Sequence, residues 1–408
     1  MKIVVLQEDS SEANVSAEEL RAHWEKLEEI PGAEVEYINA GSYPAPPEID
    51  KLLGDAEAAF GIWIGPSVIN REFLSHHPKL HYIGMLGHGY EMYEQAVCDE
   101  HNLTLTNTIY GSSTIAEYGF ALLMNICHHV DLHNDYIQRT DWSAPNMSED
   151  EFCHTLTPQV ELFGKTIGIV GLGNIGLHMA EIARGFGMKV IAWSRHKKSA
   201  EDIYRMLARE NGLEAAGGVS SPVDDSKLSM KKTTAGGGKA SVGSKTDALA
   251  DAVDGVKLKE LAAELHARSE ALFREIRQVE TLDEIYEEAD VVSLHVPHTK
   301  ETEHLVDATA LKKMKKSAIL INTARGKLID EAALADALKS GEIYAAGLDV
   351  LAEEPPKHGS PLIGCPHCTI TGHIAWLTHE SRLRAVDMAV AQYKSYLAGH
   401  PVSVIRGY

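Results

Sequence analysis

Arg325, Glu354 and His373 each follow a strand-like segment in the second half of the sequence, and their side chains have complementary chemistry. An arginine can hold a carboxylate through two parallel hydrogen bonds, which a lysine ammonium group does less well. A histidine can exchange a proton with a hydroxyl group near neutral pH, and a paired glutamate favours the protonated imidazole. Each residue alone also suits a structural role. Together, they suit hydride transfer between a 2-hydroxy acid and a 2-keto acid.

A glycine-rich turn has the pattern of a dinucleotide-binding site. It follows the apolar run Ile167–Val170 and precedes the helix-like segment Leu177–Ala183, and the strand-like run Met188–Trp193 comes where a βαβ unit requires it. The glycines allow a tight turn, close approach of a pyrophosphate and close packing of the helix on the strand. The residues expected to bind the cofactor here are Gly171, Gly173, Asn174, Ile175 and Gly176.

The end of the second strand-like run indicates which nicotinamide cofactor binds. An NAD-dependent enzyme of this kind has an Asp or Glu about 20 residues past the glycine turn, where the carboxylate binds the ribose hydroxyls. This sequence has Ser194 there, followed by Arg195 and then by Lys197 and Lys198. Serine can donate a hydrogen bond to a 2′-phosphate, and arginine can pair with it. A solvated basic turn is the alternative, but the pattern favours NADP(H), with Ser194 and Arg195 as its contacts.

Four further strand-like segments place polar or charged residues at their carboxyl ends. Open parallel sheets bind their ligands at that edge. The segments are Asp290–Pro297, Ser317–Gly326, Ala345–Val350 and His367–Thr371. The sequence therefore predicts an α/β fold in which a parallel sheet brings the reactive residues together.

Residues 1 to about 110 form an α/β unit of their own that lacks the phosphate-binding glycines. Strands are expected at Lys2–Leu6, Glu34–Ile38, Ala58–Ile64, Leu80–Leu86 and Leu103–Asn107. Gly87, His88 and Gly89 come directly after one of these strands, where backbone amides could meet an anionic substrate. An ordinary glycine turn is the alternative for this stretch.

Ser199–Gln278 interrupts the α/β alternation and is expected to be an insertion. Its low-complexity tract, Gly217–Lys245, is expected to be disordered, because such a composition buries too little apolar surface. Val256–Gln278 is expected to be a helix, with Leu258, Leu265 and Leu272 seven residues apart on a face that packs against the body or a partner helix. The insertion should be dispensable for chemistry, with its two ends close together on the surface.

The composition is that of an ordinary soluble globular protein. Its 408 residues suggest two domains, and 44% of them are hydrophobic and 24% charged. The formal net charge of -21 argues against a nucleic-acid partner. No signal peptide and no apolar run of about 18 residues is apparent, so a cytoplasmic protein with no membrane partner is expected. The five cysteines are widely spread, which favours reduced thiols.

The motifs along the chain resemble the D-isomer-specific 2-hydroxyacid dehydrogenase family. The resemblance covers nearly the whole chain outside the insertion. It rests on Gly-Leu-Gly-Asn-Ile-Gly at 171–176, Leu-His-Val-Pro at 294–297, Asn-Thr-Ala-Arg-Gly at 322–326, Leu-Asp-Val-Leu-Ala-Glu-Glu-Pro at 348–355 and Gly-His-Ile-Ala-Trp at 372–376. The resemblance implies that Arg325, Glu354 and His373 are the catalytic residues, with Glu354 preferred over Glu353 because it directly precedes the proline.

The same resemblance implies two Rossmann-like, doubly wound parallel-sheet domains with the active-site cleft between them. The substrate domain would be 1–112 and 377–408, ending in a helix near Thr378–Gly399, and the dinucleotide-binding domain would be 113–376. A homodimer formed through the dinucleotide-binding domain is also expected. Thr323 and Asp349 would contact the nicotinamide end of the cofactor. Further cofactor contacts are expected at His295, Val296, Pro297 and Ala324, and substrate contacts at Gly87, His88, Gly89 and Arg325.

Within the family, the sequence most resembles bacterial glycerate dehydrogenases, also called hydroxypyruvate reductases. The expected reaction is reduction of hydroxypyruvate or glyoxylate to D-glycerate or glycolate, with NADP(H) preferred and NAD(H) as the alternative cofactor. Two residues depart from the usual pattern of the family. His88 stands where a small or hydroxylated residue is more usual, and Gly372 stands where the family has a proline. The alternatives are a corepressor-like protein that senses NAD(H) and a D-lactate-type dehydrogenase, whereas the histidine and glutamate disfavour formate or phosphite oxidation. No metal is expected, because Cys365, His367 and Cys368 lack a second cysteine pair to complete a zinc site.

Overall fold

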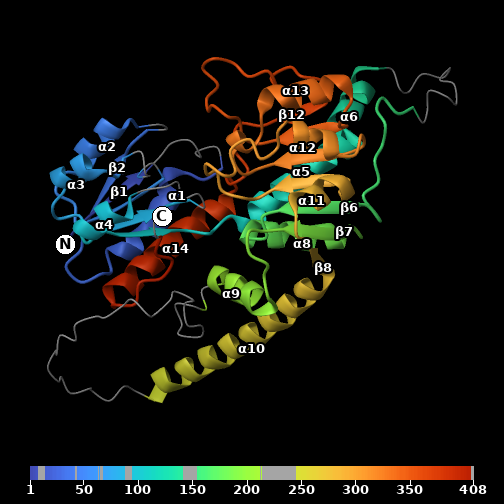
Figure 1. Ribbon diagram of the computed structural model, residues 1–408. Helices are drawn as coiled ribbons and strands as arrows, with labels where there is room; N and C mark the ends of the chain where they lie inside the picture. The colour runs from blue at the N-terminus through green and yellow to red at the C-terminus, as the bar shows by residue number, and fades with distance from the viewer. Residues whose placement is uncertain are drawn as a thin grey trace. The chain divides into compact units, whose positions relative to one another are not determined.

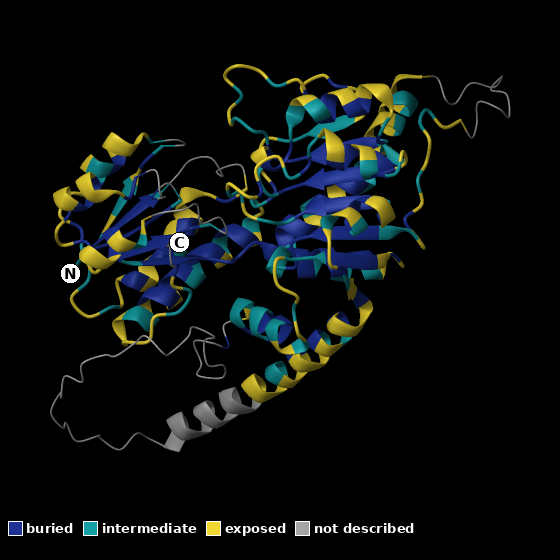
Figure 2. Ribbon diagram, viewed as in Figure 1, coloured by how far each residue is buried: buried dark blue, intermediate teal, exposed yellow. Residues whose placement is uncertain are grey.

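Two parallel β-sheets, each with helices on both faces, are the framework of the protein (Figure 1). The computed structural model describes residues 1–7, 14–41, 44–62, 64, 68–87, 94–140, 154–211, 213 and 245–405, without the side chains of 245–256. The strands of both sheets are largely buried, whereas the helices expose their outer faces (Figure 2). The predicted α/β class with two doubly wound sheets is confirmed.

The first sheet has five parallel strands in the order β2-β1-β3-β4-β5. The order reverses beside β1, which is typical of doubly wound folds. The strands are β1 (Lys2–Gln7), β2 (Glu34–Asn39), β3 (Ala58–Gly61), β4 (Tyr82–Met85) and β5 (Thr104–Asn107). All five expected strands are therefore present, although β3 and β4 are shorter than the apolar runs suggested.

Both faces of the first sheet are covered by helices. On one face lie α2 (Pro46–Leu53), α3 (Arg71–His76) and α4 (Gln95–Glu100), and on the other α1 (Ala17–Trp24), its continuation η1 (Glu25–Leu27), and α14 (His379–Leu397). The ring of Tyr393 on α14 packs 5.4 Å from Phe60 and 4.6 Å from Tyr82, measured between ring centroids. The Ile405 N–H donates to the Leu105 oxygen at 2.9 Å. The C-terminal helix and the chain after it thus pack on the N-terminal sheet.

The second sheet has seven parallel strands in the order β12-β11-β10-β9-β6-β7-β8. The order reverses between β6 and β9, and open α/β sheets bind nucleotides at such a reversal. The strands are β6 (Thr166–Val170), β7 (Lys189–Trp193), β8 (Ile276–Gln278), β9 (Val291–Leu294), β10 (Ile319–Asn322), β11 (Ala345–Leu348) and β12 (Cys368–Ile370). Because all are parallel, the residues that follow β9, β10, β11 and β12 share one edge of the sheet.

Helices also cover both faces of the second sheet. One face carries α11 (Leu282–Glu288), α12 (Ala308–Lys313) and α13 (Glu331–Ser340), and the other carries α5 (Ser112–His128) and α8 (Asn174–Gly185). Gly119 lets α5 approach α8 closely, because a Cβ there would lie 3.3 Å from Met179 Cε. Two shorter elements complete this part of the fold, α6 (Val130–Arg139) after α5 and η3 (Gly326–Leu328) after β10.

Lys198–Arg274 forms a compact unit of its own. It contains α9 (Ala200–Glu210) and most of α10 (Lys245–Glu275). Within it, the rings of Tyr204 and His266 stack with their centroids 3.5 Å apart. Leu265 and Leu272 are buried, but Leu258 is 38% exposed, so only part of the expected leucine stripe is covered. Residues 217–244 of the low-complexity tract lie outside the described residues.

One expectation about the insertion is wrong. The helix expected to reach Gln278 ends at Glu275, because Ile276–Gln278 forms β8 and pairs with β7. Burial of Ile276 in this pairing outweighs the helical pattern of the preceding residues. The ends of the expected insertion do lie close together at the surface, because Lys197 pairs with Glu280 and the Val279 N–H donates to the Ala192 oxygen at 2.9 Å. Since β8 is parallel to β7, the part of the insertion before β8, residues 198–274, leaves the carboxyl end of β7 and returns to the amino end of β8.

We predict that Lys198–Arg274 can be replaced without loss of cofactor binding, provided that β8 is kept. A Gly/Ser linker of about 15 residues is long enough to cross between parallel strands. The glycine turn and the strand ends lie outside the replaced residues, so NADPH should bind with the affinity of the full chain. Circular dichroism and a fluorescence titration with NADPH check this. As a control, the same linker in place of 198–278 removes β8 and should weaken both the folding of the chain and its binding of NADPH. A folded protein with 198–274 replaced that binds no NADPH would contradict the prediction.

Four cysteines in the described residues are free thiols, Cys98, Cys127, Cys365 and Cys368, while Cys153 lies outside them. Burial raises the pKa of Cys127 to about 11 and that of Cys368 to about 12. Such thiols are poor nucleophiles at neutral pH, so they are not candidates for the chemistry. Among the helices that the structure describes, none is both long and apolar enough to span a bilayer.

Candidate active site

Gly171 forms the tight turn that ends β6. Its φ is 105°, which favours glycine, and a Cβ there would lie 2.6 Å from the backbone oxygen of His295. The Gly171 N–H donates to the Trp193 oxygen at 2.8 Å, and the His295 N–H donates to the Val170 oxygen at 2.7 Å. The turn is therefore fixed between β7 and β9, where the strand order reverses.

Gly173 and Gly176 shape the start of α8, whose first turn contains Asn174 and Ile175. A Cβ on Gly176 would lie 2.2 Å from the Gly171 oxygen, so the helix begins directly against the turn. Gly173 is the N-cap, and no atom of the described residues lies within 4 Å of the place that a Cβ on it would take. The N-terminus of α8, with its partial positive charge, therefore borders open space of the kind that a pyrophosphate needs.

Ser194 and Arg195 follow β7 at the same edge of the sheet. The Ser194 hydroxyl donates to the backbone oxygen of His196 at 2.8 Å, and Arg195 is exposed. Hydrogen bonds from the Thr299 hydroxyl and a backbone amide, with the nearby charges of Arg195 and Lys300, lower the pKa of Glu301. A phosphate bound at Arg195 would therefore also meet the field of the Glu301 carboxylate.

Asn322, the last residue of β10, folds the loop that carries Arg325. Its Nδ2 donates to the Arg325 backbone oxygen at 2.9 Å, and its Oδ1 accepts from the Ala324 N–H at 3.0 Å. The guanidinium of Arg325 donates one hydrogen bond, from Nη1 to the Ala324 oxygen at 2.7 Å. Thr323 is 8% exposed, and its buried hydroxyl has no hydrogen-bond partner among the described residues. An unpaired buried hydroxyl costs about 1–3 kcal/mol, so a polar ligand group would stabilise this loop.

Gly326 lets the Arg325 loop pack against the loop that carries Glu354. A Cβ on Gly326 would lie 1.9 Å from the backbone carbon of Leu351 and 2.4 Å from the nitrogen of Ala352. Any larger residue would force the two loops apart, since the clash is with backbone. The close packing places Arg325 where its charge acts on the Glu354 carboxylate.

Glu354 and His373 form a hydrogen-bonded pair, with 2.9 Å between Glu354 Oε2 and His373 Nδ1. Burial disfavours ionisation of Glu354. The hydrogen bond and charge of His373, the Leu351 N–H at 3.0 Å and the charge of Arg325 outweigh it and hold the pKa of Glu354 below its usual value. The His373 and Glu354 side chains are 42% and 36% exposed. Because Nδ1 faces Glu354, the opposite ring nitrogen, Nε2, is the atom that His373 can offer to a ligand.

Asp349 holds the loop that carries His373. The residue is completely buried, and its carboxylate accepts from the Thr371 hydroxyl at 2.6 Å and from the N–H groups of Ile374 and Ala375 at 3.0 and 2.9 Å. Its backbone oxygen accepts from the His373 N–H at 2.7 Å. The side chain thus shapes the His373 loop, and its contact with a nicotinamide stays a prediction.

His295, Val296 and Pro297 leave β9 beside the glycine turn. His295 Nε2 and the Ser293 hydroxyl lie 2.8 Å apart. Burial lowers the pKa of His295 to about 4, so its ring is neutral at physiological pH. The segment lies against Gly171, where the sequence predicts cofactor contacts.

The comparison with known families agrees with this geometry. Residues 120–223 and 224–375 match the model of "D-isomer specific 2-hydroxyacid dehydrogenase, NAD binding domain". The chain belongs to this family. The motif-based prediction is confirmed.

Three relatives illustrate how far the dehydrogenase resembles known proteins. It is 31% identical over 359 residues to the hydroxypyruvate reductase of Blautia hydrogenotrophica, covering 88% of this chain and 87% of that one. It is 29% identical over 373 residues to the glycerate dehydrogenase of Methylorubrum extorquens, covering 91% and 92%. The solved TT0316 protein from Thermus thermophilus is 25% identical, with a TM-score of 0.68 and coverage of 99% and 100%.

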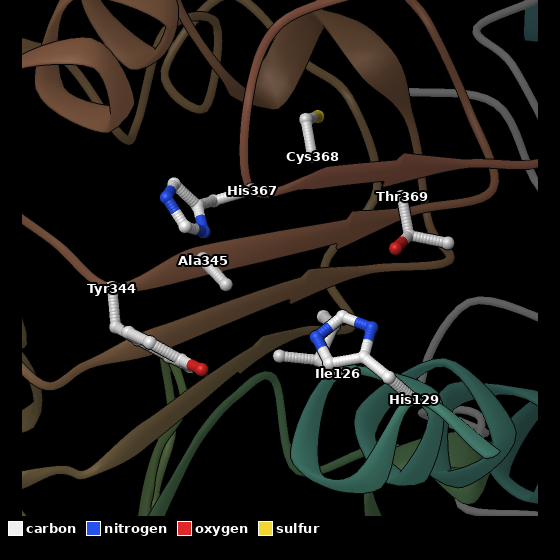
Figure 3. Close-up of a pocket in the computed structure, with 7 residues that line it drawn as sticks. All are labelled: Ile126, His129, Tyr344, Ala345, His367, Cys368 and Thr369. Carbon is white, nitrogen blue, oxygen red and sulfur yellow. The ribbon is translucent and has the colours of Figure 1, made fainter. Parts of the chain in front are cut away.

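Two hollows lie at the amino ends of the strands of the dehydrogenase's second sheet, opposite the carboxyl ends that carry the predicted reactive residues. The first, about 150 Å³, is lined by His129, Tyr344 and His367 among others (Figure 3), and the second, about 230 Å³, also borders Tyr344. Tyr344 and His367 directly precede β11 and β12, so they lie at the amino ends of these strands. The predicted reactive residues follow the carboxyl ends, so neither hollow is the candidate active site.

The remaining predicted residues are placed as follows. Gly87 comes two residues after β4, and no atom of the residues that the structure describes lies within 4 Å of the place that a Cβ on it would take. His88 and Gly89 lie outside the described residues. The described part of the dehydrogenase contains no group of three His, Cys, Asp or Glu residues that could hold a metal.

Sequence reasoning missed the positioning roles of Asn322, Gly326 and Asp349. The available signals were an asparagine before a tight turn and a glycine directly after a reactive arginine.

Proposed function

We propose that this dehydrogenase reduces hydroxypyruvate or glyoxylate to D-glycerate or glycolate with NADPH. The observation that carries the proposal is the 2.9 Å contact between Glu354 and His373, beside the loop of Arg325. The similarity to a hydroxypyruvate reductase over 88% of the chain and to a glycerate dehydrogenase over 91% supports the substrate class.

In this proposal each reactive side chain has one task. Arg325 binds the substrate carboxylate with the guanidinium donors that the Ala324 oxygen does not occupy. His373 donates the Nε2 proton to the carbonyl oxygen, and Glu354 keeps the imidazole oriented and protonated through Nδ1. The nicotinamide, when bound, supplies the hydride. In the reverse direction, His373 Nε2 accepts the proton of the substrate hydroxyl.

The residues of the second sheet fit a bound dinucleotide. The open space at Gly173 and the N-terminus of α8 suit the pyrophosphate, and the Thr323 hydroxyl, which has no partner in the described part of the chain, suits a polar group of the nicotinamide. The residues proposed to hold the cofactor are Gly171, Gly173, Asn174, Ile175, Gly176, Ser194, Arg195, His295, Val296, Pro297, Thr323, Ala324 and Asp349.

We further infer a substrate domain of residues 1–112 and 377–408 and a cofactor domain of 113–376. The packing of α14 on α1, β4 and β5 supports the discontinuous substrate domain, and the packing of α5 on α8, β10 and β11 supports the start of the cofactor domain. A cleft between the two domains and a homodimer formed through the cofactor domain belong to the same proposal.

A substrate panel tests the proposed reaction. The purified full chain should reduce hydroxypyruvate or glyoxylate with a higher kcat/KM than pyruvate when NADPH is saturating. A preference for pyruvate would instead indicate a D-lactate-type enzyme. NADPH binding without turnover of any 2-keto acid would indicate a corepressor-like binding protein.

The cofactor preference is predicted to reside in Ser194 and Arg195. A double variant, Ser194→Asp with Arg195→Ala, should shift the ratio of kcat/KM values from NADPH towards NADH, because a carboxylate repels the 2′-phosphate and binds the ribose hydroxyls instead. The matched control is Lys197→Ala, since Lys197 pairs with Glu280 and should leave the ratio unchanged. Wild-type kinetics that favour NADH at equal concentrations would refute the prediction.

A further inference from the structure

Glu331, the first residue of α13, accepts hydrogen bonds from both ends of the segment 352–360, which carries Glu354. Its Oε1 accepts from the Ala352 N–H at 2.7 Å, and its Oε2 accepts from the Ser360 hydroxyl at 2.6 Å. Both donors are part-buried, and hydrogen bonds to an ionised carboxylate are shorter and stronger than neutral ones. One side chain on α13 therefore links two points of the loop that lie on either side of Glu354.

The helix itself does not require this carboxylate as a cap. Asp330 is the N-cap of α13, and its Oδ1 accepts from the N–H groups of Ala332 and Ala333, each at 3.1 Å. A negative charge in the first turn of a helix is favoured by the helix dipole. Both of its carboxylate oxygens are then available to the loop.

The bond from Glu331 lies next to the one that orients Glu354. The N–H groups of Leu351 and Ala352 are consecutive in the chain, and they donate to Glu354 Oε1 and Glu331 Oε1 respectively. The same two residues meet the backbone of Gly326, directly after Arg325. Any shift of the Ala352 peptide would therefore move the amide that holds Glu354.

We propose that Glu331 is a positioning residue that fixes Glu354 against His373 and Arg325. It ties the segment from β10 through η3 to α13, which carries Arg325, to the loop that carries Glu354. The inference rests on the proposed function, in which the reduction requires a protonated imidazole. Without the tether, the Glu354 carboxylate spends less time at Nδ1 of His373, so the imidazolium is less stabilised and the rate is lost at lower pH.

Three variants of the full chain test the proposal. Glu331→Ala removes both acceptors and should lower kcat for hydroxypyruvate about tenfold or more, with the KM for NADPH unchanged and the fall of the pH–rate profile moved to lower pH. Glu331→Gln keeps an acceptor for the Ala352 N–H and should restore most of the rate. The matched control is Glu353→Gln, because Glu353 bonds to His358 in the same loop and should leave the pH profile in place.

A double variant separates positioning from a general loss of structure. If Glu331 acts through Glu354, adding Glu331→Ala to Glu354→Gln should change neither the pH profile nor kcat further. Effects that multiply would show that Glu331 acts elsewhere and would overturn the proposal. So would a Glu331→Ala variant with the wild-type pH profile.

Hydrogen exchange of the loop provides a readout that does not depend on activity. Glu331→Ala should speed exchange in a peptide covering 352–360, whereas Glu353→Gln should leave the Ala352 amide protected. Unchanged exchange in Glu331→Ala would contradict the tether even if the protein reduces no 2-keto acid. If the wild-type chain has no reductase activity but Glu331→Ala still speeds exchange, the tether is supported and the proposed function is refuted.

Discussion

Replacing His373 with alanine should lower kcat for 2-keto acid reduction by about 10²–10⁴-fold, the usual contribution of a general acid. The alanine cannot deliver a proton to the carbonyl oxygen as the hydride arrives, while the cofactor-binding residues are untouched. The measurement is steady-state kinetics at saturating NADPH. His358→Ala is the matched control, because His358 is an exposed histidine that bonds to Glu353 rather than to Glu354.

The same prediction has a pH component that comes from Glu354. Its pKa is held below the usual value, so the carboxylate is ionised throughout the neutral range and stabilises the protonated His373 ring. The rate of reduction should therefore fall as pH rises and the imidazolium is lost, and Glu354→Gln should move that fall to lower pH. A His373→Ala variant with near-native turnover would rule out this role for the histidine.

Replacing Arg325 with lysine should lower kcat/KM for the 2-keto acid by about 30-fold or more, which corresponds to about 2 kcal/mol of transition-state binding. The guanidinium can bind a carboxylate through two parallel bonds, whereas an ammonium offers a single directed contact. The matched control is Lys327→Ala, because Lys327 is exposed two residues further along and should leave kcat/KM unchanged. If Arg325→Lys retains the wild-type kcat/KM, the arginine does not bind the carboxylate.

The predictable part of the fold is the part with short-range signals. Apolar runs with Gly or polar residues at their ends correctly predicted β1 to β5 in the first sheet. In the second sheet they correctly predicted β6 and β7 beside the glycine turn and β9 to β12, which the predicted reactive residues follow. The strand β8 was not predictable in this way, because Ile276–Gln278 directly continues a long helical pattern. Whether these residues form a strand or a helix is decided by their pairing with β7, which is a tertiary interaction.

The candidate site divides in the same manner. The pairing of Glu354 with His373 follows from residue types at successive strand ends, and the structure places the two at hydrogen-bond distance. The sequence predicts a cofactor contact for Asp349, but it gives no sign that this buried carboxylate also accepts hydrogen bonds from the loop that holds His373. Roles of this kind depend on which backbone groups come within reach, and residue type alone does not give that information.

One measurement addresses the central claim that this chain reduces a 2-keto acid through His373, Glu354 and Arg325. Purified protein is mixed with NADPH and hydroxypyruvate, and NADPH oxidation is followed while the configuration of the product is determined by chiral chromatography. The account predicts one molecule of D-glycerate for each NADPH oxidised, and loss of this turnover in His373→Ala with NADPH still bound. NADPH that binds but is not oxidised by hydroxypyruvate, glyoxylate or pyruvate, or turnover that survives in His373→Ala, would contradict it.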